Sequence, residues 1–272
     1  MDKNFKVSII SVNFNDKINM EKTIKSVLLQ TYNNIEHIII DGGSSDGSVD
    51  IIKQYEPLYK GKLKWISEPD KGIADACNKG LKIATGDIIN IFIDEYASIY
   101  TVEKMVTVIE KKNADGACSG MFFVNKNNKV IRIWSGKKGS LFLGWMPATP
   151  SLFLKKNIHD RYGLSSTDYI AAADYDYDIR ILKDKTINII SIKELLVYYT
   201  AGGVSNNGIN SNINGIKETY KALKNNNMPL PWFTTLCKCI IAFCAYLFAS
   251  RKTVILDDLI SNELNEIKKR NN

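Results

Sequence analysis

A nearly all-apolar run that ends in two acids constrains the fold more than any other part of this chain. Residues 88–93, IINIFI, are apolar except at Asn90, which is the pattern of a strand buried on both faces of a sheet. The run ends abruptly at Asp94 and Glu95. In open α/β sheets, ligands bind beyond the carboxyl ends of the strands. The position of the two acids therefore favours metal or sugar ligands over ordinary solvated turn residues.

Strands and helices alternate through the first third of the chain. This alternation predicts an α/β fold with a parallel, doubly wound sheet. We expect Gly86 to cap the third helix at its C-terminal end. Further along, residues 187–192 and 195–199 are expected to form two short strands. The early strands are expected at residues 7–12, 35–40, 63–66 and 88–93, and the helices between them at residues 18–28, 49–55 and 74–84.

Polar and acidic residues follow the strands of this pattern. Asn13 and Asn15 come after the first strand, and Asp41 begins a loop, DGGSSDG, after the second. That loop combines an acid at the strand tip, glycines free to adopt positive φ, and hydroxyls that can cap the next helix. Asp75 lies in the first turn of the third helix, where the helix dipole stabilises an acid even without a functional role.

Two common nucleotide-binding motifs do not occur in the sequence. No GxGxxG follows the first strand, and there is no GxxxxGK[ST]. A dinucleotide fold and a P-loop are therefore disfavoured. Two histidines and the lack of a CxxC motif also argue against a zinc site. What remains is a nucleotide site built from acids at strand ends.

The chain carries a formal net charge of +7, and its basic residues gather towards the C-terminus. This distribution favours an anionic membrane surface over nucleic acid as a partner, because no basic patch interleaved with aromatic residues occurs elsewhere. A solvated basic tail is the alternative. The N-terminus lacks the basic region and cleavage site of a signal peptide, so we expect a reducing, cytoplasmic compartment.

An asparagine- and glycine-rich segment, residues 206–214, precedes a long apolar stretch. Residues 232–249 are nearly all apolar and about long enough to span a bilayer. Lys238 within this stretch, and lysines on both sides, favour a helix that lies in the membrane interface or packs on the domain, with a spanning helix as the alternative. We expect residues 207–272 to form a C-terminal helical region, peripherally associated with the inner face of the cell membrane.

Five segments, taken in order, resemble those of family 2 glycosyltransferases with the GT-A fold. The similarity covers roughly residues 5–206 and is strongest to small bacterial enzymes that assemble O-antigen, capsule and exopolysaccharide. It implies a Rossmann-like, mostly parallel central sheet flanked by helices, with residues 1–97 binding the nucleotide sugar and residues 98–206 binding the acceptor. The segments are VSIISVNFN, IIIDGGSSDGSVDIIKQY, ISEPDKGIADACNKGLKIATGDIINIFI, AADYDYDIRIL and YTAGGVSN.

The resemblance implies a role for each polar residue at the nucleotide end. Asp41 resembles the acid that accepts a hydrogen bond from the base, most often uracil, and the two asparagines after the first strand flank the same pocket. Asp75 resembles the acid that approaches the base and ribose. The nucleotide-binding residues implied in this way are Asn13, Asn15, Asp41, Gly42, Lys71 and Asp75.

The resemblance also implies a catalytic base. Asp174, in AADYD, resembles the carboxylate of inverting members that takes the proton from the acceptor hydroxyl as its oxygen attacks the anomeric carbon. Asp178 lies four residues on and shares its helical face, so a purely structural role is open for it. The segment with Gly203 and Ser205 resembles a family loop close to the active site.

The sequence departs from the family at two places. Members usually carry Asp-x-Asp or Asn-x-x-Asp after the fourth strand, whereas here Glu95 falls where the metal-binding aspartate is expected, and Tyr96 follows it. Thr149 stands where the family loop has a histidine, and that loop is expected to lie in the active site. One or two carboxylates plus the diphosphate can still hold Mn²⁺ or Mg²⁺. We predict metal binding only alongside nucleotide, with Glu95 as principal ligand and Asp94 second.

Together these features predict a membrane-associated inverting glycosyltransferase. It would transfer a sugar from a nucleotide donor, most often UDP-linked in the family, to a lipid-linked saccharide during surface-polysaccharide assembly. Two alternatives stay open. The altered residues at Glu95–Tyr96 and Thr149 are compatible with a degenerate, non-catalytic paralogue that binds nucleotide sugar, and the apolar C-terminal region is compatible with a membrane-docked scaffold subunit.

Overall fold

The computed structural model describes residues 4–92, 94–125, 129–200 and 209–247. The strands are β1 (Val7–Asn13), β2 (Ile35–Asp41), β3 (Leu63–Ser67), β4 (Ile88–Ile91), β5 (Glu95–Tyr96), β6 (Gly116–Val124), β7 (Val130–Trp134), β8 (Phe153–Lys155) and β9 (Ile189–Thr200). The α-helices are α1 (Lys17–Leu28), α2 (Ser48–Tyr55), α3 (Ile73–Ile83), α4 (Thr101–Lys111), α5 (Lys156–Tyr162), α6 (Ala173–Leu182), α7 (Ile209–Asn225) and α8 (Pro231–Leu247). Short 3-10 helices are η1 (Glu56–Tyr59), η2 (Leu141–Leu143) and η3 (Thr149–Ser151).

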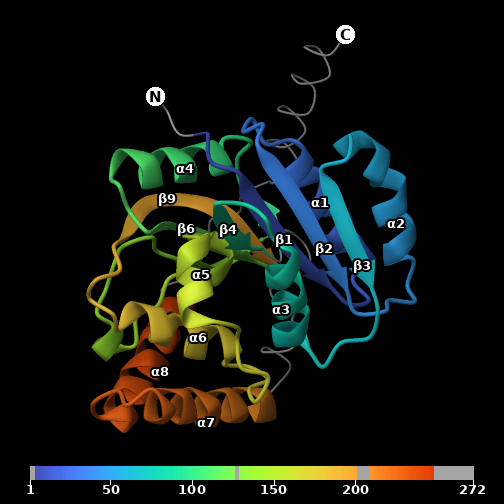
Figure 1. The fold of residues 1–272 in the computed structure, drawn as a ribbon. Helices are drawn as coiled ribbons and strands as arrows, with labels where there is room; N and C mark the ends of the chain where they lie inside the picture. Colours follow the sequence, from blue (N-terminus) through green and yellow to red (C-terminus); the bar gives the residue numbers. More distant parts are fainter. Residues whose placement is uncertain (1–3, 93, 126–128, 201–208, 248–272) are drawn as a thin grey trace.

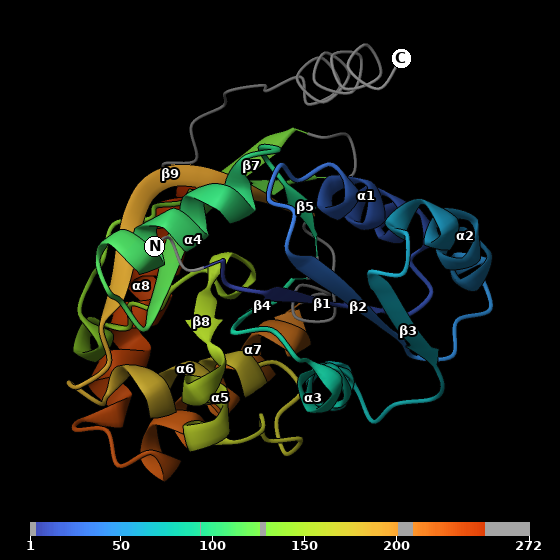
Figure 2. The ribbon, with the colours of Figure 1, turned by 45° about the horizontal axis from the view of Figure 1, so that its top comes forward.

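All of these strands join one sheet in the order β3-β2-β1-β4-β8-β6-β9-β5, with β7 beside β6. The first four strands of the order are parallel, as the strand–helix alternation predicts. β8 then runs antiparallel to both β4 and β6, while β9 is parallel to β6 and arches across the molecule (Figure 2). The sheet therefore combines a parallel N-terminal half with a mixed C-terminal half.

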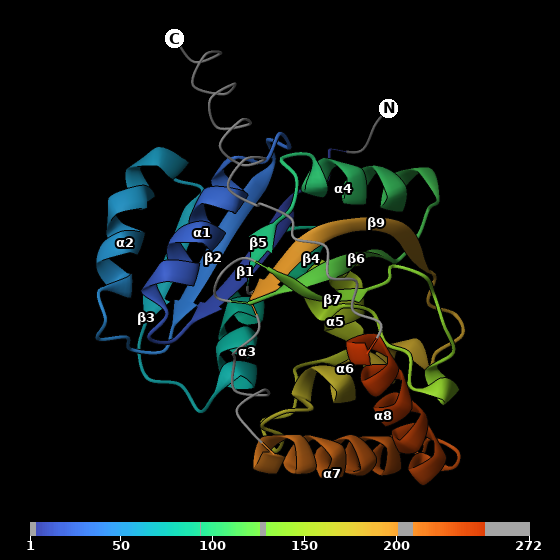
Figure 3. The same cartoon turned by 180° about the vertical axis from the view of Figure 1, so that it is seen from behind.

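Helices cover both faces of the sheet. On β2, Ile39 faces α1, α2 and α4, where it packs in one apolar cluster with Ile24 of α1. Its neighbour Ile38 points to the opposite face and packs against Leu81 of α3, as the alternation of side chains along a strand requires. Figure 1 shows α3 and α5 in front of the sheet, and Figure 3, from behind, shows α1 and α2 in front of it.

The register of the parallel strands brings polar residues together at one edge. Asn13 pairs with Asp41 across β1 and β2, and Asp41 pairs with Ser67 across β2 and β3. Parallel strands that end at the same level present their last side chains side by side, at the carboxyl edge where α/β folds bind ligands. The chain therefore assembles a polar cluster from three segments far apart in sequence.

The C-terminal helices pack on the rest of the molecule. Ala222 and Leu223 of α7 are fully buried against Tyr175 and Ile179 of α6, and the Thr234 hydroxyl of α8 donates a hydrogen bond of 2.9 Å to the carbonyl oxygen of Phe142. Figure 3 shows both helices next to α6. Of the alternatives for the apolar stretch, packing on the domain is the one observed. Within the described residues, no helix is both long enough and apolar enough to cross a membrane.

Local details differ from the sequence-based expectations at two places. Gly86 does not cap α3, because the helix ends at Ile83 with Ala84 in an extended conformation. Gly86 instead lies against β1, where a Cβ atom would come within 2.6 Å of the Ser8 nitrogen. The two short strands expected after residue 187 are one continuous strand, β9, whose register against β6 shifts near Gly120. The apolar periodicity signals strand here but does not reveal a bulge within it.

Candidate active site

The polar cluster at the ends of β1, β2 and β3 is centred on Asp41. Its side chain is fully buried, yet both carboxylate oxygens accept hydrogen bonds. Asn13 Nδ2 donates at 2.8 Å and Ser67 Oγ at 2.7 Å, while the Ser44 hydroxyl and backbone N–H donate at 2.6 and 2.9 Å. Burial alone would raise the pKa of Asp41, but these donors outweigh it and hold the pKa below its ordinary value.

The loop after β2 is fixed to the end of β1. Asn15 adopts φ 50°, a left-handed conformation that asparagine tolerates, and its Oδ1 accepts a hydrogen bond of 2.8 Å from the Ser45 N–H. Gly42 lies so close to the next loop that a Cβ atom would meet Asp70 Oδ2 at 2.6 Å. A larger residue at position 42 would displace the Asp70 side chain, so glycine allows the close approach of the two loops.

Asp75 lies in the first turn of α3, as the sequence predicts. Its Oδ2 accepts a hydrogen bond of 3.1 Å from the backbone N–H of Lys71, an exposed residue just before the helix. This contact fixes the entry to α3 and leaves the Lys71 side chain in solvent. The helix-capping interpretation of Asp75 therefore describes its present contacts, and nucleotide binding by Asp75 and Lys71 stays a prediction.

The end of β4 carries the acids expected to hold a metal. Asp94 is buried, and its Oδ1 accepts a hydrogen bond of 2.9 Å from the Thr200 N–H. Burial raises the pKa of Asp94 to about 7, against the effect of that hydrogen bond. Glu95 lies on the short strand β5 and pairs with Tyr198 of β9. Tyr96 is buried, stacks on Phe92 with ring centroids 3.9 Å apart, and donates to Asn90 Oδ1.

These residues do not form a metal site made by the protein alone. Among the described residues, no three His, Cys, Asp or Glu side chains gather closely enough to hold a metal ion. A hard cation prefers six or more oxygen ligands, whereas the Asp94 carboxylate already accepts a hydrogen bond from Thr200 and burial favours its protonated form. Metal binding by Glu95 and Asp94 together with a nucleotide diphosphate stays a prediction.

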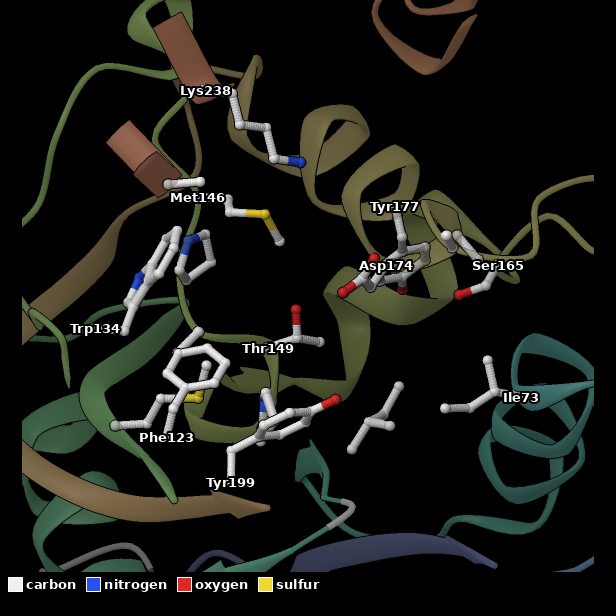
Figure 4. A pocket seen from close by; sticks show the side chains of 18 of the residues that line it. Ile73, Phe123, Trp134, Met146, Thr149, Ser165, Asp174, Tyr177, Tyr199 and Lys238 are labelled. Carbon is white, nitrogen blue, oxygen red and sulfur yellow. The ribbon is translucent and has the colours of Figure 1, made fainter. Parts of the chain in front are cut away.

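A cavity of about 380 Å³ opens between α3, α6, α8 and the C-terminal half of the sheet. Figure 4 shows Asp174 and Thr149 in its middle, Ile73 of α3 at one end, and Lys238 and Trp134 towards the other. Aromatic side chains and methionines form much of the wall, and flat apolar surfaces of this kind suit the faces of sugar rings. They are Phe123, Trp134, Tyr177, Tyr199, Met121 and Met146.

Asp174 is placed in this cavity by the first turn of α6. Its side chain is exposed to the cavity. Desolvation by the surrounding protein raises the pKa of Asp174 above its ordinary value, while the nearby Lys238 ammonium and the Tyr175 N–H, which donates at 2.7 Å, favour the charged form. A carboxylate with few donors and a raised pKa is a stronger base than an ordinary aspartate.

Asp178 lies one turn further along α6 and is fully enclosed. Burial, and then the charge of Asp174, raise the pKa of Asp178 well above its ordinary value and favour its neutral form. Thr149 Oγ1 lies 3.5 Å from Asp178 Oδ2 and joins both acids to η3. Asp174 and Asp178 lie on one face of α6, as the sequence predicts. Asp174 lines the cavity, and Asp178 lies beneath it.

Two further residues hold these elements in place, and the sequence did not single them out for that role. Asn90, the polar exception in β4, is fully buried and donates to the carbonyl oxygens of Pro150 and Leu152, each at 3.0 Å, which fixes η3. Glu218 of α7 accepts hydrogen bonds from the N–H groups of three successive residues, the shortest of them 2.7 Å from Ala171. A carboxylate at this end of α6 favours the helix through its dipole.

Comparison with known proteins agrees with this architecture. The family model "Glycosyl transferase family 2" matches residues 8–163, more than half of the chain. The chain belongs to glycosyl transferase family 2.

Several curated relatives of this family 2 chain are glycosyltransferases by name. An uncharacterized glycosyltransferase of Mycobacterium tuberculosis, Rv1514c, is 46% identical over 84 residues, which are 30% of this chain and 31% of the relative. The putative glycosyltransferase EpsE of Bacillus subtilis is 35% identical over 113 residues, 41% of each chain. A Mycobacterium bovis PGL/p-HBAD biosynthesis glycosyltransferase is 24% identical over 206 residues, 73% of this chain and 78% of the relative. The first two alignments thus span less than half of those relatives.

Solved structures show that this family 2 chain has the GT-A fold. The mannosyltransferase PcManGT from Pyrobaculum calidifontis, in complex with GDP-Man and Mn²⁺, aligns with a TM-score of 0.64 at 15% identity over 96% of this chain and 80% of that one. Residues 1–349 of TarS from S. aureus, in complex with UDP, give 0.61 at 14% identity over 93% and 77%. The expected fold class is confirmed.

The predicted site residues of this family 2 chain fall into two groups. Asn13, Asn15, Asp41 and Gly42 meet at the ends of the parallel strands, and Thr149 and Asp174 meet in the cavity. Asp94 and Glu95 do not line that cavity, and Gly203 and Ser205 lie outside the described residues.

Sequence reasoning did not assign two cations of the cavity, Arg132 and Lys238, to the site. The sequence could have indicated the role of Lys238, because a lysine inside an apolar helix needs polar surroundings. Arg132, between apolar neighbours in β7, had a weaker one.

Proposed function

We propose that this protein is an inverting glycosyltransferase that transfers a sugar from a nucleotide sugar, with Asp174 as the general base. One observation carries the proposal. The Asp174 carboxylate, with its raised pKa, lies in a sugar-sized cavity that begins at α3 and extends away from it. The donor is proposed to be a UDP-sugar, which is supported by the shared fold of TarS, solved with UDP and with UDP-GlcNAc.

The proposed donor site is the carboxyl edge of β1–β3. Asn13, Asn15 and Gly42 shape the loop after β2 around Asp41, and Lys71 and Asp75 lie at the adjacent entrance to α3. Because both oxygens of Asp41 are occupied by protein donors, we assign Asp41 chiefly to holding this loop, with contact to the base through the loop it holds. Asp94 and Glu95 are proposed to lie on the diphosphate side, and Gly203 and Ser205 are proposed to belong to an active-site loop.

The proposed chemical step needs a base and a path for the proton. The acceptor hydroxyl oxygen attacks the anomeric carbon from the side opposite the diphosphate, and the carbon–oxygen bond to the diphosphate breaks. The hydroxyl proton passes to the Asp174 carboxylate, and the nucleoside diphosphate leaves with the bonding electron pair. Aromatic side chains such as Trp134 and Tyr199 exclude water and support the sugar faces.

The acceptor is proposed to be lipid-linked and to reach the cavity along α8. Trp232, Leu236, Ile240 and Phe243 are each more than half exposed, and their spacing places them on one face of the helix. Lys238 lines the cavity from another face of α8. An exposed apolar stripe beside a basic region suits the interface of an anionic membrane. This arrangement supports peripheral association with the cytoplasmic face of the membrane.

The proposal is tested by donor turnover. The full chain is incubated with UDP-, GDP-, CDP- and dTDP-sugars, with and without Mn²⁺, and nucleotide release is measured together with the anomeric configuration of the product. Slow release of UDP from one UDP-sugar, with inversion at the anomeric carbon, is the expected result. Retention of configuration, or no turnover of any donor that binds, would remove Asp174 from the role of base in an inverting transfer.

A non-catalytic nucleotide-sugar-binding protein is the second candidate. It is favoured by the end of β4, where Tyr96 is buried against Phe92 and Asp94 is engaged with Thr200. The intact Asp174 in its cavity favours the enzyme. Donor binding without turnover in the same experiment would select this second candidate.

A further inference from the structure

The end of the cavity away from α3 carries two cations. Figure 4 shows Lys238 directed into the cavity near Trp134 and Met146, with Ile73 at the opposite end. Arg132 also lines the cavity. It lies opposite Phe123 across β6 and β7 and two residues before Trp134, so all three share one face of the sheet. Its guanidinium carbon is 4.7 Å from the Phe123 ring centroid and 4.9 Å from that of Trp134.

Neither cation has a carboxylate partner among the described residues. The ion pairs found there involve neither Arg132 nor Lys238, and Arg132 Nε is buried without a hydrogen-bond partner. Asp174 is the single carboxylate among the described residues that line the cavity. Both side chains are half-buried. A cation withdrawn from water is costly unless an anion compensates it, so this end of the cavity is suited to a negative charge.

Lys238 is partly compensated, whereas Arg132 is not. Lys238 Nζ lies 3.3 Å from the centroid of the Tyr175 ring, a favourable cation–π position. Burial lowers the pKa of Lys238 to about 8, and the charge of Asp174 counteracts that effect. For Arg132, burial lowers the pKa and no acid counteracts it. The aromatic rings cover part of the guanidinium, and its remaining N–H donors suit the paired oxygens of a phosphate or carboxylate.

We propose that Arg132 and Lys238 form an acceptor subsite for an anionic group, a phosphate or a carboxylate carried by the acceptor. That the anionic group belongs to a sugar acceptor rests on the proposed transfer function. The binding of an anion by Arg132 and Lys238 does not depend on that function. Lys238 and Trp134 lie at the end of the cavity away from α3, whereas the nucleotide loop lies beside the entrance to α3, where Gly42 approaches Asp70. The subsite is therefore remote from the nucleotide loop and lies beyond Asp174, where an acceptor enters.

Binding of four small probes tests the proposal on the full chain. Geranyl diphosphate and geraniol form the phosphate pair, and methyl glucuronide and methyl glucoside form the carboxylate pair. Affinities are measured by calorimetry with saturating UDP present, so that the nucleotide end is filled. We expect one anionic probe to bind at least roughly tenfold more tightly than its neutral partner, and the pair that responds identifies the source of the charge.

Variants connect the binding to the two cations. Arg132→Gln should weaken the anionic probe at least roughly tenfold and leave UDP affinity unchanged, and Lys238→Met should weaken it less. Lys224→Met, which removes an exposed lysine of α7, is the matched control and should change neither. Arg132→Lys keeps the charge but loses the paired donors, so it should give an intermediate affinity and replaces the glutamine variant if that variant does not fold.

Three results would overturn the subsite. They are equal binding of charged and neutral probes, unchanged anion affinity in both Arg132 variants, and displacement of the anion by UDP, which would assign the cations to the donor diphosphate. Failure of UDP to bind, with anion binding intact, would instead contradict the proposed function and leave the subsite standing. The two ideas therefore fail separately.

Discussion

Asp41 and Asp174 are both acids at the ends of secondary-structure elements, but the protein treats them in opposite ways. Asp41 is buried and receives hydrogen bonds on both oxygens, and its pKa is lowered. Asp174 faces the cavity and receives a close backbone hydrogen bond from Tyr175, and desolvation raises its pKa. Donors that satisfy a carboxylate make it a rigid structural element, whereas a scarcity of donors keeps its affinity for a proton. The polar cluster around Asp41 is thus held rigidly by its hydrogen bonds, whereas Asp174 in the cavity keeps its affinity for a proton.

The strongest test of this contrast is Asp174→Asn. The amide keeps the shape but cannot take a proton, so we expect transfer to fall by roughly 10²–10⁴-fold while UDP affinity stays close to wild type. The raised pKa means that the protonated form of Asp174 favours folding. This contribution is fully present below the ordinary pKa of aspartate and is lost as pH rises from there through the raised value. The variant should therefore be no less stable than wild type at neutral pH. Near-normal transfer would contradict the assignment.

Asp41→Asn should lower stability and weaken UDP binding, rather than act on the chemical step as Asp174→Asn does. An amide nitrogen would face donors such as Ser44 N–H and Ser67 Oγ, so we expect a loss of about 1–3 kcal/mol in the free energy of unfolding and weaker UDP binding. The lowered pKa of Asp41 adds stability above the ordinary pKa of aspartate, and this stability is lost as pH falls through the lowered value. Urea denaturation at neutral and acidic pH measures both effects. A variant as stable as wild type would show that the loop does not depend on this acid.

Glu95→Gln tests the predicted metal ligands that follow β4. If Glu95 is the principal metal ligand alongside nucleotide, Mn²⁺ should strengthen UDP binding by the wild type but not by this variant. Asp94→Asn should reduce the Mn²⁺ effect less, since Asp94 is buried and engaged with Thr200. Calorimetry in Mn²⁺ and in EDTA provides the measurement. Equal wild-type affinity in both conditions would reject both ligands.

Glu218→Ala should affect the cavity while leaving the nucleotide end intact. It removes the carboxylate that accepts the N–H groups before α6, so we expect a loss of about 0.5–2 kcal/mol in stability. The reaction rate should fall because Asp174 is less well held, while UDP affinity should not change. Glu218→Gln keeps an acceptor and is the matched control. A fall in UDP affinity would show that the two ends are mechanically coupled.

Asp178→Asn should give the smallest effect. Burial and the charge of Asp174 raise the pKa of Asp178 well above its ordinary value and favour its neutral form, which the amide resembles in charge and shape. Transfer should rise with pH through the raised pKa of Asp174 in wild type and variant alike, because the base must be ionised to accept a proton. A shift of this pH profile towards lower pH in the variant would mean that Asp178 carries charge beside Asp174.

The polar cluster around Asp41, at the ends of β1, β2 and β3, could be predicted from sequence because its parts are local. Its role in nucleotide binding stays a proposal. Strand ends, glycines and capping hydroxyls are all visible around Asp41, and parallel pairing then brings them together. The cavity depends on contacts between distant segments. No local pattern indicates that Glu218 caps α6 or that Lys238 lines the same cavity as Asp174. Tyr96 follows the position where the family carries its metal-binding aspartate, yet it forms part of the core by bonding to Asn90, which only the packing of β4 against η3 explains.

The position of Lys238 near the end of the described chain has a consequence for biosynthesis. The ribosome releases the segments that carry Asn13, Asp41 and Ser67 early, and this edge of the sheet can assemble while the chain is still growing. The cavity wall needs α8, whose residues emerge roughly ten to thirty seconds later at ordinary elongation rates. The nascent chain can thus assemble the polar cluster around Asp41 before it completes the cavity around Asp174.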